Sequence, residues 1–89
     1  MSDWKFVETD AAEQFCRMEH FGVRKHDVEF VVTVREYMQP PDPSMPFFAQ
    51  ADKQVNQRTA AYTPSGWGST QNDALWECIK AIRKFPYEP

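Results

Sequence analysis

The strongest constraint on the fold is the stretch 28–37, where apolar and polar side chains alternate. Alternation of this kind is typical of a β-strand with one buried face, because successive side chains of a strand point to opposite faces of the sheet. The apolar face carries Val28, Phe30, Val32 and Val34, and the polar face carries Glu29, Thr33 and Arg35. The chain is therefore expected to build a sheet that is covered on at least one side.

Two further stretches alternate more briefly and predict the rest of this sheet. Residues 47–52 form one strand and residues 58–63 form a weaker one, and the polar stretch 53–57 suits a hairpin connection between them. Prolines interrupt the segment 39–46, so we expect a stiff loop there. Because Pro40, Pro43 and Pro46 repeat at the period of a polyproline helix, a role of this loop as a ligand stays open.

A first helix is predicted over Thr9 to Phe21. Thr9 and Asp10 are candidate N-caps, Glu13 stands where a capping box requires it, and Gly22 is a stop signal. Its apolar positions are Ala12, Phe15, Cys16 and Met18.

A second helix is predicted to begin after Thr70 and to end before Pro86. Thr70 is its N-cap and Asp73 completes a loose capping box. The apolar stripe of this helix consists of Ala74, Leu75, Cys78, Ile79 and Ile82.

The order helix, strand, strand, strand, helix predicts an α+β fold of one domain, residues 1–89. Its three-stranded antiparallel sheet would carry both helices on one face (α-β-β-β-α), since consecutive strands with short connections pair antiparallel. A chain of 89 residues has room for a single core. The other face of the sheet would be solvent-exposed or covered by a partner, and it carries Val31, Arg35, Tyr37, Phe48 and Gln50.

Charge and composition narrow the function classes. A net charge of −3 and a pI near 5.3 argue against the broad basic surface of most nucleic-acid-binding proteins. No apolar stretch approaches the roughly 20 residues that a membrane-spanning helix needs, so we expect no membrane association. The start of the chain has no apolar run of signal-peptide type, which predicts a cytoplasmic protein with two free thiols.

A loop with Gly66 and Gly68 runs into a final helix that begins Ser69-Thr70 and contains Ala74-Leu75. With the predicted element order, this arrangement resembles the double-stranded-RNA-binding domain. That family carries clustered lysines at the start of the last helix, whereas residues 69–73 of this chain contain an aspartate and no lysine. The run from Gly66 to Leu75 also resembles HicB-like antitoxins, which implies a protein that binds and neutralises a partner.

Catalytic and metal-binding patterns are weak. Neither cysteine belongs to a spaced Cys/His cluster, and a zinc site drawn from Cys16, His20, His26 and Cys78 matches no known knuckle spacing. The carboxylates are scattered without an acid/base pair. We therefore expect no metal and no cofactor, and an enzyme is the least supported class.

The turn before the last helix is a candidate anion site, because free backbone N–H groups and the helix dipole meet there. Its simpler interpretation is a tight turn with an N-cap, since the motif spacing and a neighbouring lysine are missing. The residues of this candidate site are Gly66, Gly68, Ser69 and Thr70, with Arg58 or Arg83 assisting.

Aromatic residues, 15% of the chain, are the unusual feature of its composition. They either complete a thin core or mark an interface with a protein partner or a second copy, where aromatic side chains commonly supply binding energy. The candidate partner-binding residues are Trp67, Trp76, Phe48, Tyr37 and Tyr87. We therefore expect a non-enzymatic protein-interaction module, and the alternative is a nucleic-acid-binding domain. In the alternative, phosphates would be bound by Arg24, Lys25, Lys80, Arg83 and Lys84.

Overall fold

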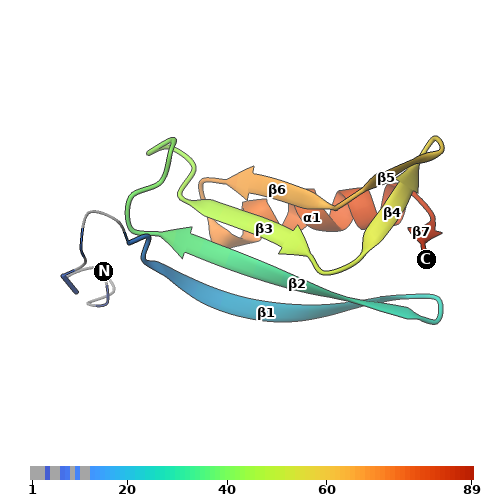
Figure 1. The fold of residues 1–89 in the computed structure, drawn as a ribbon, viewed down its shortest axis with the longest axis horizontal. Coiled ribbons are helices and arrows are strands. Elements are labelled where there is room, and N and C mark those ends of the chain that lie inside the picture. The colour runs from blue at the N-terminus through green and yellow to red at the C-terminus, as the bar shows by residue number, and fades with distance from the viewer. Residues whose placement is uncertain (1–3, 5–6, 9, 11–12) are drawn as a thin grey trace.

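The computed structural model of this chain describes residues 4, 7–8, 10 and 13–89, and within them the architecture is mostly β (Figure 1). Seven strands and one helix are present among these residues. In chain order they are β1 (Cys16–Lys25), β2 (Val28–Tyr37), β3 (Phe47–Ala51), β4 (Gln54–Gln57), β5 (Ala60–Tyr62), β6 (Ser65–Gly68), α1 (Gln71–Lys84) and β7 (Tyr87–Glu88).

The strands form two antiparallel sheets, one with the order β1-β2-β3-β6 and one with the order β5-β4-β7. Strands β3 and β4 pair with β6 and β5, so residues 47–68 form one long hairpin that bends between the two sheets. The amide of Ala51 donates to the carbonyl of Pro64 (2.9 Å) at this bend. The hairpin reverses at Arg58 and Thr59, whose positive φ angles of 53° and 70° are those of a primed two-residue turn.

The predicted first helix is wrong, and with it the fold of three strands and two helices. From Cys16 onward this segment is strand β1, which pairs with β2 along its whole length. Met18 and Phe21 also fit helical spacing, but Phe21 and Val23 alternate with polar residues and lie opposite apolar residues of β2. Cross-strand pairing therefore outweighs a weak helical pattern. Residues 9, 11 and 12 of the predicted helix lie outside the described residues.

Gly22, the predicted end of that helix, lies inside β1 and ends no element. The chain reverses instead at the two residues His26 and Asp27, between β1 and β2. His26 has a φ of 55°, in the left-handed region that few non-glycine residues adopt. A tight turn without glycine or proline gives little sequence signal, which is why this hairpin was missed.

Two of the predicted strands are confirmed and the third is divided. Strand β2 has the predicted bounds, and β3 ends one residue earlier than expected. The predicted connection 53–57 contains strand β4, and the predicted strand 58–63 contains the turn and strand β5. The glycine-rich loop around Trp67 is the fourth strand of the first sheet, β6.

The core lies between α1 and one face of the first sheet, which is the far side of the sheet in Figure 1. Its buried hydrophobic side chains come from strands β2, β3 and β4 and from the helix: Phe30, Val32, Val34, Ala49, Ala51, Val55, Ala74, Cys78 and Ile82. Gly66 and Gly68 let the helix approach the edge strand β6 at backbone distance. A Cβ atom built on Gly68 would lie 2.4 Å from the amide nitrogen of Ala74, and one on Gly66 would lie 2.4 Å from the Cβ of Glu77.

Both ends of α1 are capped. The hydroxyl of Thr70 accepts a hydrogen bond from the amide of Asp73 (3.1 Å), which confirms the predicted N-cap. At the other end the ammonium group of Lys25 donates to the carbonyls of Ile82 (2.9 Å), Arg83 (3.4 Å) and Phe85 (2.7 Å). A cation from the end of β1 thus satisfies the last carbonyls of the helix and its negative dipole end.

The Pro-rich connection between β2 and β3 is a hydrogen-bonded turn at its tip. The amide of Met45 donates to the carbonyl of Asp42 (2.9 Å), and the Asp42 carboxylate accepts from the amide (3.0 Å) and hydroxyl (2.7 Å) of Ser44. These bonds lower the pKa of Asp42. A polyproline helix has no internal hydrogen bonds, so this tip does not have the geometry of a polyproline ligand.

Membrane insertion through a helix is not indicated by the described part of the chain. Its helix is too short and too polar to cross a bilayer.

Candidate functional site

The uncovered face of the first sheet holds a cluster of three aromatic rings. Tyr37 of β2, Phe48 of β3 and Trp67 of β6 all occupy positions that alternate with the buried side chains. Phe48 lies directly opposite Trp67, and their ring centroids are 4.6 Å apart. Tyr37 stacks on Trp67 with centroids 6.0 Å apart and an interplanar angle of 29°. We call these three residues the aromatic cluster.

The aromatic cluster is only partly covered by its own packing. Trp67 keeps 38% of its surface exposed, whereas Tyr37 and Phe48 are half-buried. Two apolar residues of the same face, Met18 of β1 and Val31 of β2, are also exposed. The outer face therefore has an apolar area that the described residues leave open to a partner.

Arg35 lies in the middle of this face. Its backbone is opposite Met18 on one side and opposite Phe48 on the other. Within the described part of the chain, its guanidinium group has no hydrogen bond, ion pair or ring contact. A half-buried arginine that lacks a partner among the described residues can bind an anionic group of another molecule.

Most of the other cations are engaged within the protein. Arg17 pairs with Glu19 (2.7 Å) and Glu36 (3.5 Å), Lys80 pairs with Glu77 (2.6 Å), and Lys25 caps α1. Of the cations proposed for a nucleic-acid site, Lys25 and Lys80 therefore have partners already. Arg24 lies on the outer face, while Lys80, Arg83 and Lys84 belong to α1 on the opposite side of the sheet. The structure does not gather them into one basic patch.

Two of the five predicted interface aromatics lie away from the aromatic cluster. Trp76 is on α1 with 48% of its surface exposed, and the guanidinium carbon of Arg83 lies 5.0 Å from the centre of its ring. Tyr87 of β7 makes an edge contact with Phe30, with ring centroids 6.0 Å apart. The structure therefore joins Tyr37, Phe48 and Trp67 on one face and leaves the other two elsewhere.

The predicted anion turn is engaged in helix packing and capping. Gly66 and Gly68 lie against α1, Thr70 caps the helix, and the hydroxyl of Ser69 donates to the carboxylate of Asp73 (3.1 Å). A carboxylate already complements the positive end of the helix dipole there. The two proposed helpers lie apart from this turn, because Arg58 is at the β4–β5 reversal and Arg83 is in the last turn of α1.

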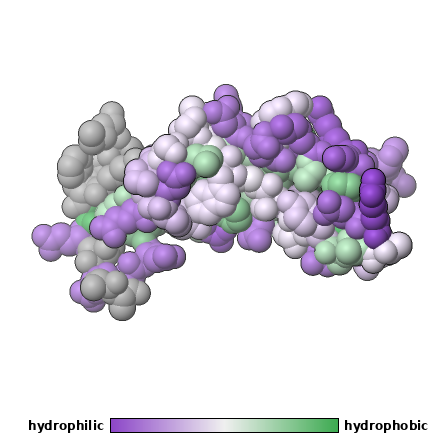
Figure 2. Space-filling view, turned by 90° about the horizontal axis from the view of Figure 1, so that it is seen from above, coloured by the Kyte–Doolittle hydropathy of each residue, from purple (hydrophilic) through white to green (hydrophobic). Residues whose placement is uncertain are grey.

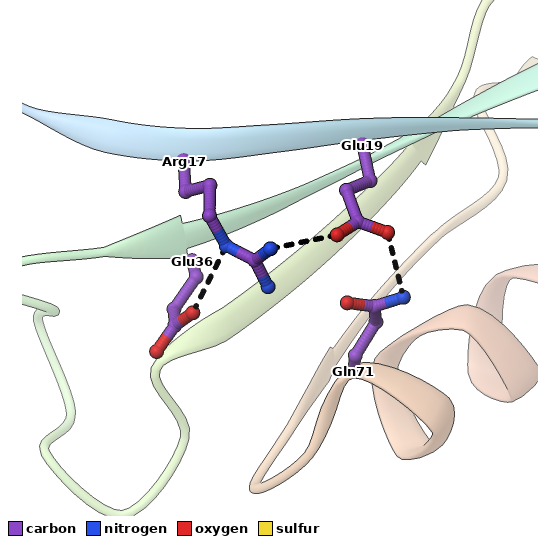
Figure 3. A network of polar contacts seen from close by, with 4 residues as sticks. All are labelled: Arg17, Glu19, Glu36 and Gln71. Carbon is purple, nitrogen blue, oxygen red and sulfur yellow. Dashed lines mark hydrogen bonds and ion pairs between the residues drawn. The ribbon is translucent and has the colours of Figure 1, made fainter. Parts of the chain in front are cut away.

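A network of polar side chains lies between β1, β2 and the start of α1 (Figure 3). Arg17 bridges Glu19 and Glu36, and the amide of Gln71 donates to Glu19 (3.2 Å). Figure 3 shows these four side chains pointing toward one another across the gap between the strands and the helix. Each carboxylate of this network is bound by a cation or an amide. The network therefore links strands β1 and β2 to the start of α1, and its four residues include no free acid/base pair.

The sulfur and imidazole groups do not converge. Cys78 is fully buried, its thiol donates to the carbonyl of Pro64 (3.4 Å), and burial raises its pKa to about 11. Cys16 lies at the start of β1, and His20 shares a hydrogen bond with Thr33 (2.9 Å). Among the residues that the structure describes, no three metal-binding side chains lie together.

Two hollows lie near the C-terminal end of α1, and sequence reasoning missed both. One, of about 420 Å³, lies between the β1–β2 turn and the chain after the helix, and its lining includes His26, Lys84 and Tyr87. The other, of about 410 Å³, lies beside Gln57 and Lys80. Figure 2 shows the molecule from above, where hydrophobic areas are small and separated by hydrophilic ones. Neither hollow brings together groups that would define a reaction.

Comparison of the chain with protein-family models, with curated proteins and with solved structures found no match. The resemblances to double-stranded-RNA-binding domains and to HicB-like antitoxins therefore stay predictions.

Proposed function

We propose that this chain is a non-enzymatic protein-interaction module that docks a partner protein on the uncovered face of its first sheet. The observation that carries the proposal is Arg35, whose guanidinium group has no partner among the described residues and whose position is on the same sheet face as the three aromatic rings. We further propose that the partner presents a carboxylate next to an apolar side chain.

The chemistry of the face supports this choice of partner. Tryptophan, tyrosine and arginine supply much of the binding energy in protein interfaces, and they do so where water is excluded around them. A partner that covered Arg35 without offering an anion would bury an unpaired charge, which is strongly unfavourable. An apolar side chain against Trp67 and a carboxylate on Arg35 would satisfy both requirements together.

A protein partner is favoured over nucleic acid because few cations are free. Binding through phosphates needs several lysines or arginines on one surface, each of which neutralises one phosphate. On the outer face only Arg24 and Arg35 are cationic among the described residues, and Arg24 lies opposite Glu29. Nucleic acid remains the second candidate because exposed rings beside arginine also stack on bases.

Both cysteines are free thiols in the structure. This supports the predicted cytoplasmic location, because disulfides are rare in reducing compartments.

Selection of peptides from a random display library on the immobilised protein tests the proposal. We expect enrichment of peptides with aspartate or glutamate beside a large apolar residue. Binding of the selected peptides, followed by Trp fluorescence and calorimetry, should fall by about tenfold or more in Trp67→Ala and in Arg35→Gln. Trp76→Ala is the matched control, since it removes an exposed tryptophan from the opposite side and should leave binding unchanged.

Two results would count against a protein partner. Selected peptides that bind Trp67→Ala as tightly as the native chain would remove the aromatic cluster from the interface. Binding of a single-stranded oligonucleotide that weakens steeply with added salt, and that Arg35→Gln abolishes, would transfer the face to the second candidate. Circular dichroism of each variant checks that the fold is retained.

A further inference from the structure

Strand β1 has one open edge. It pairs with β2 from Cys16 to Lys25, and among the residues that the structure describes no other strand of the first sheet pairs with it. Figure 1 shows β1 along the border of the molecule, with no other labelled element beside its outer edge. The strand contains no proline, and its ladder with β2 runs without a bulge. A long regular edge of this kind exposes unpaired backbone donors and acceptors and is a template for another strand.

We propose that a second copy of this chain pairs antiparallel with the open edge of β1, across a two-fold axis at Gly22. The two four-stranded sheets would then form one continuous sheet. The contact uses the edge of the sheet and leaves the aromatic cluster free, so it is independent of the function proposed above.

The side chains of β1 select this register. A two-fold axis perpendicular to the sheet keeps both helix-covered faces on the same side, so each residue pairs with one from the same face. With the axis at Gly22, Phe21 lies opposite the second copy's Val23, and Glu19 lies opposite the second copy's Lys25. Apolar side chains therefore meet apolar ones, and each pair occurs twice. Glu19 and Lys25 keep their contacts within the monomer and add no like-charged pair.

Neighbouring registers match less well. With the axis at Phe21, Arg17 would lie opposite the second copy's Lys25, which places like charges together. With the axis at His20, Glu19 would lie opposite the second copy's Phe21. Registers centred nearer either end of β1 pair fewer residues. The apolar pairing of Phe21 with Val23 and the lack of like-charged pairs therefore favour the axis at Gly22.

The packing of the monomer leaves room for this contact. Phe21 and Val23 are half-buried and pack against the core from its margin, so a second copy would complete their cover. The helix lies mainly over β6 and β3 and makes few contacts with β1. It therefore does not obstruct a strand that adds to the β1 edge.

Disulfide trapping tests the register directly. In a Cys16→Ser background, Gly22→Cys should give a covalent dimer on mild oxidation, because residues opposite each other on antiparallel strands have Cα atoms about 4.5 to 5.5 Å apart, within disulfide reach. Arg24→Cys is the matched control on the same face. Its Cα atom would be four residues, about 13 Å, from its symmetry mate and should not cross-link. No cross-link at position 22, or equal cross-linking at both positions, would overturn the proposal.

A charge variant tests the same contact without covalent chemistry. Gly22→Lys should be tolerated in the monomer, because the carboxylate of Glu29 lies 3.3 Å from the position of the added Cβ and would pair with the new cation. At the axis two such cations would face each other, so dimerisation measured by light scattering should weaken about tenfold. Gly22→Ala should keep the dimer. A native chain that is monomeric at all concentrations tested would contradict the proposal.

Discussion

The two faces of the first sheet are built from the same strands but have opposite chemistry. The face under α1 is lined by Phe30, valines and alanines, and Gly66 and Gly68 bring the helix within backbone distance. The opposite face carries the aromatic cluster and Arg35, whose guanidinium group has no partner in the described part of the chain. The covered face therefore uses small and aliphatic side chains for close packing, whereas the open face places its largest rings where the described protein does not cover them.

This difference separates stability from binding. Substitutions on the covered face should lower the free energy of unfolding, because its side chains are closely packed against the helix. Substitutions on the open face should act on association and leave the fold in place. Four measurements test this separation of stability from binding.

Phe30→Ala should have the largest effect. Phe30 is fully buried between the sheet and the C-terminal segment, where it contacts Tyr87. Loss of a buried phenylalanine ring lowers the free energy of unfolding by about 3 to 5 kcal/mol. Urea unfolding of the native chain and the variant measures this difference. A loss below about 1 kcal/mol would mean that the covered face does not dominate stability.

Gly68→Ala should lower the free energy of unfolding by about 3 kcal/mol, although it adds a single methyl group. The added carbon would lie 2.4 Å from the amide nitrogen of Ala74, so the helix or the strand must shift. Gly22→Ala is the control, because its added carbon meets only the flexible end of Glu29 at 3.3 Å. Equal effects of the two substitutions would show that helix packing on β6 is looser than the distances imply.

Stability should fall as pH rises from about 9 to about 11, through Cys78. Burial raises the pKa of this thiol from 9.0 to about 11, so the unfolded chain ionises first and gains from alkaline pH. The contribution is complete below pH 9 and is lost by about 2 to 3 kcal/mol once the folded thiol also ionises. Unfolding measured across this range should have a flatter profile in Cys78→Ala. Equal slopes for both chains would contradict this origin.

Arg35→Gln should change the free energy of unfolding by less than about 0.5 kcal/mol, because its guanidinium group has no partner to lose among residues 4, 7–8, 10 and 13–89. The same substitution should weaken binding of the acidic peptides by about tenfold or more. A stability loss greater than about 1.5 kcal/mol would assign Arg35 to the fold and remove it from the interface.

The parts of the fold that the sequence predicted are those with strong local signals. Strand β2 alternates over its whole length, and α1 has an N-cap, an apolar stripe and a proline after its end. The β1–β2 hairpin was missed because His26-Asp27 is an unusual turn and because residues 9–21 contain helix-capping residues. The identity of β1 depends on its pairing with β2, which is a non-local interaction that a single segment does not reveal.

Part of the candidate site was also predictable, because alternation along a strand is a local signal. Alternation placed Tyr37, Phe48 and Arg35 on the outer face, and the structure has them there. Trp67 was expected in a loop, and its place beside Phe48 follows from the pairing of β3 with β6. The absence of a partner for Arg35 among the described residues depends on where every carboxylate lies in space, which no pattern in the sequence indicates.

The close approach of α1 to β6 also limits which substitutions these two elements can tolerate during evolution. Gly66 and Gly68 face Ala74, Glu77 and the backbone of Cys78 with no spare volume. In related chains, a larger side chain on the strand would need a shift of the helix, and a larger side chain at position 74, where Ala74 is fully buried, would need space that the core does not have. We expect these strand and helix positions to vary together or not at all, while residues of the open face follow the evolution of whatever they bind.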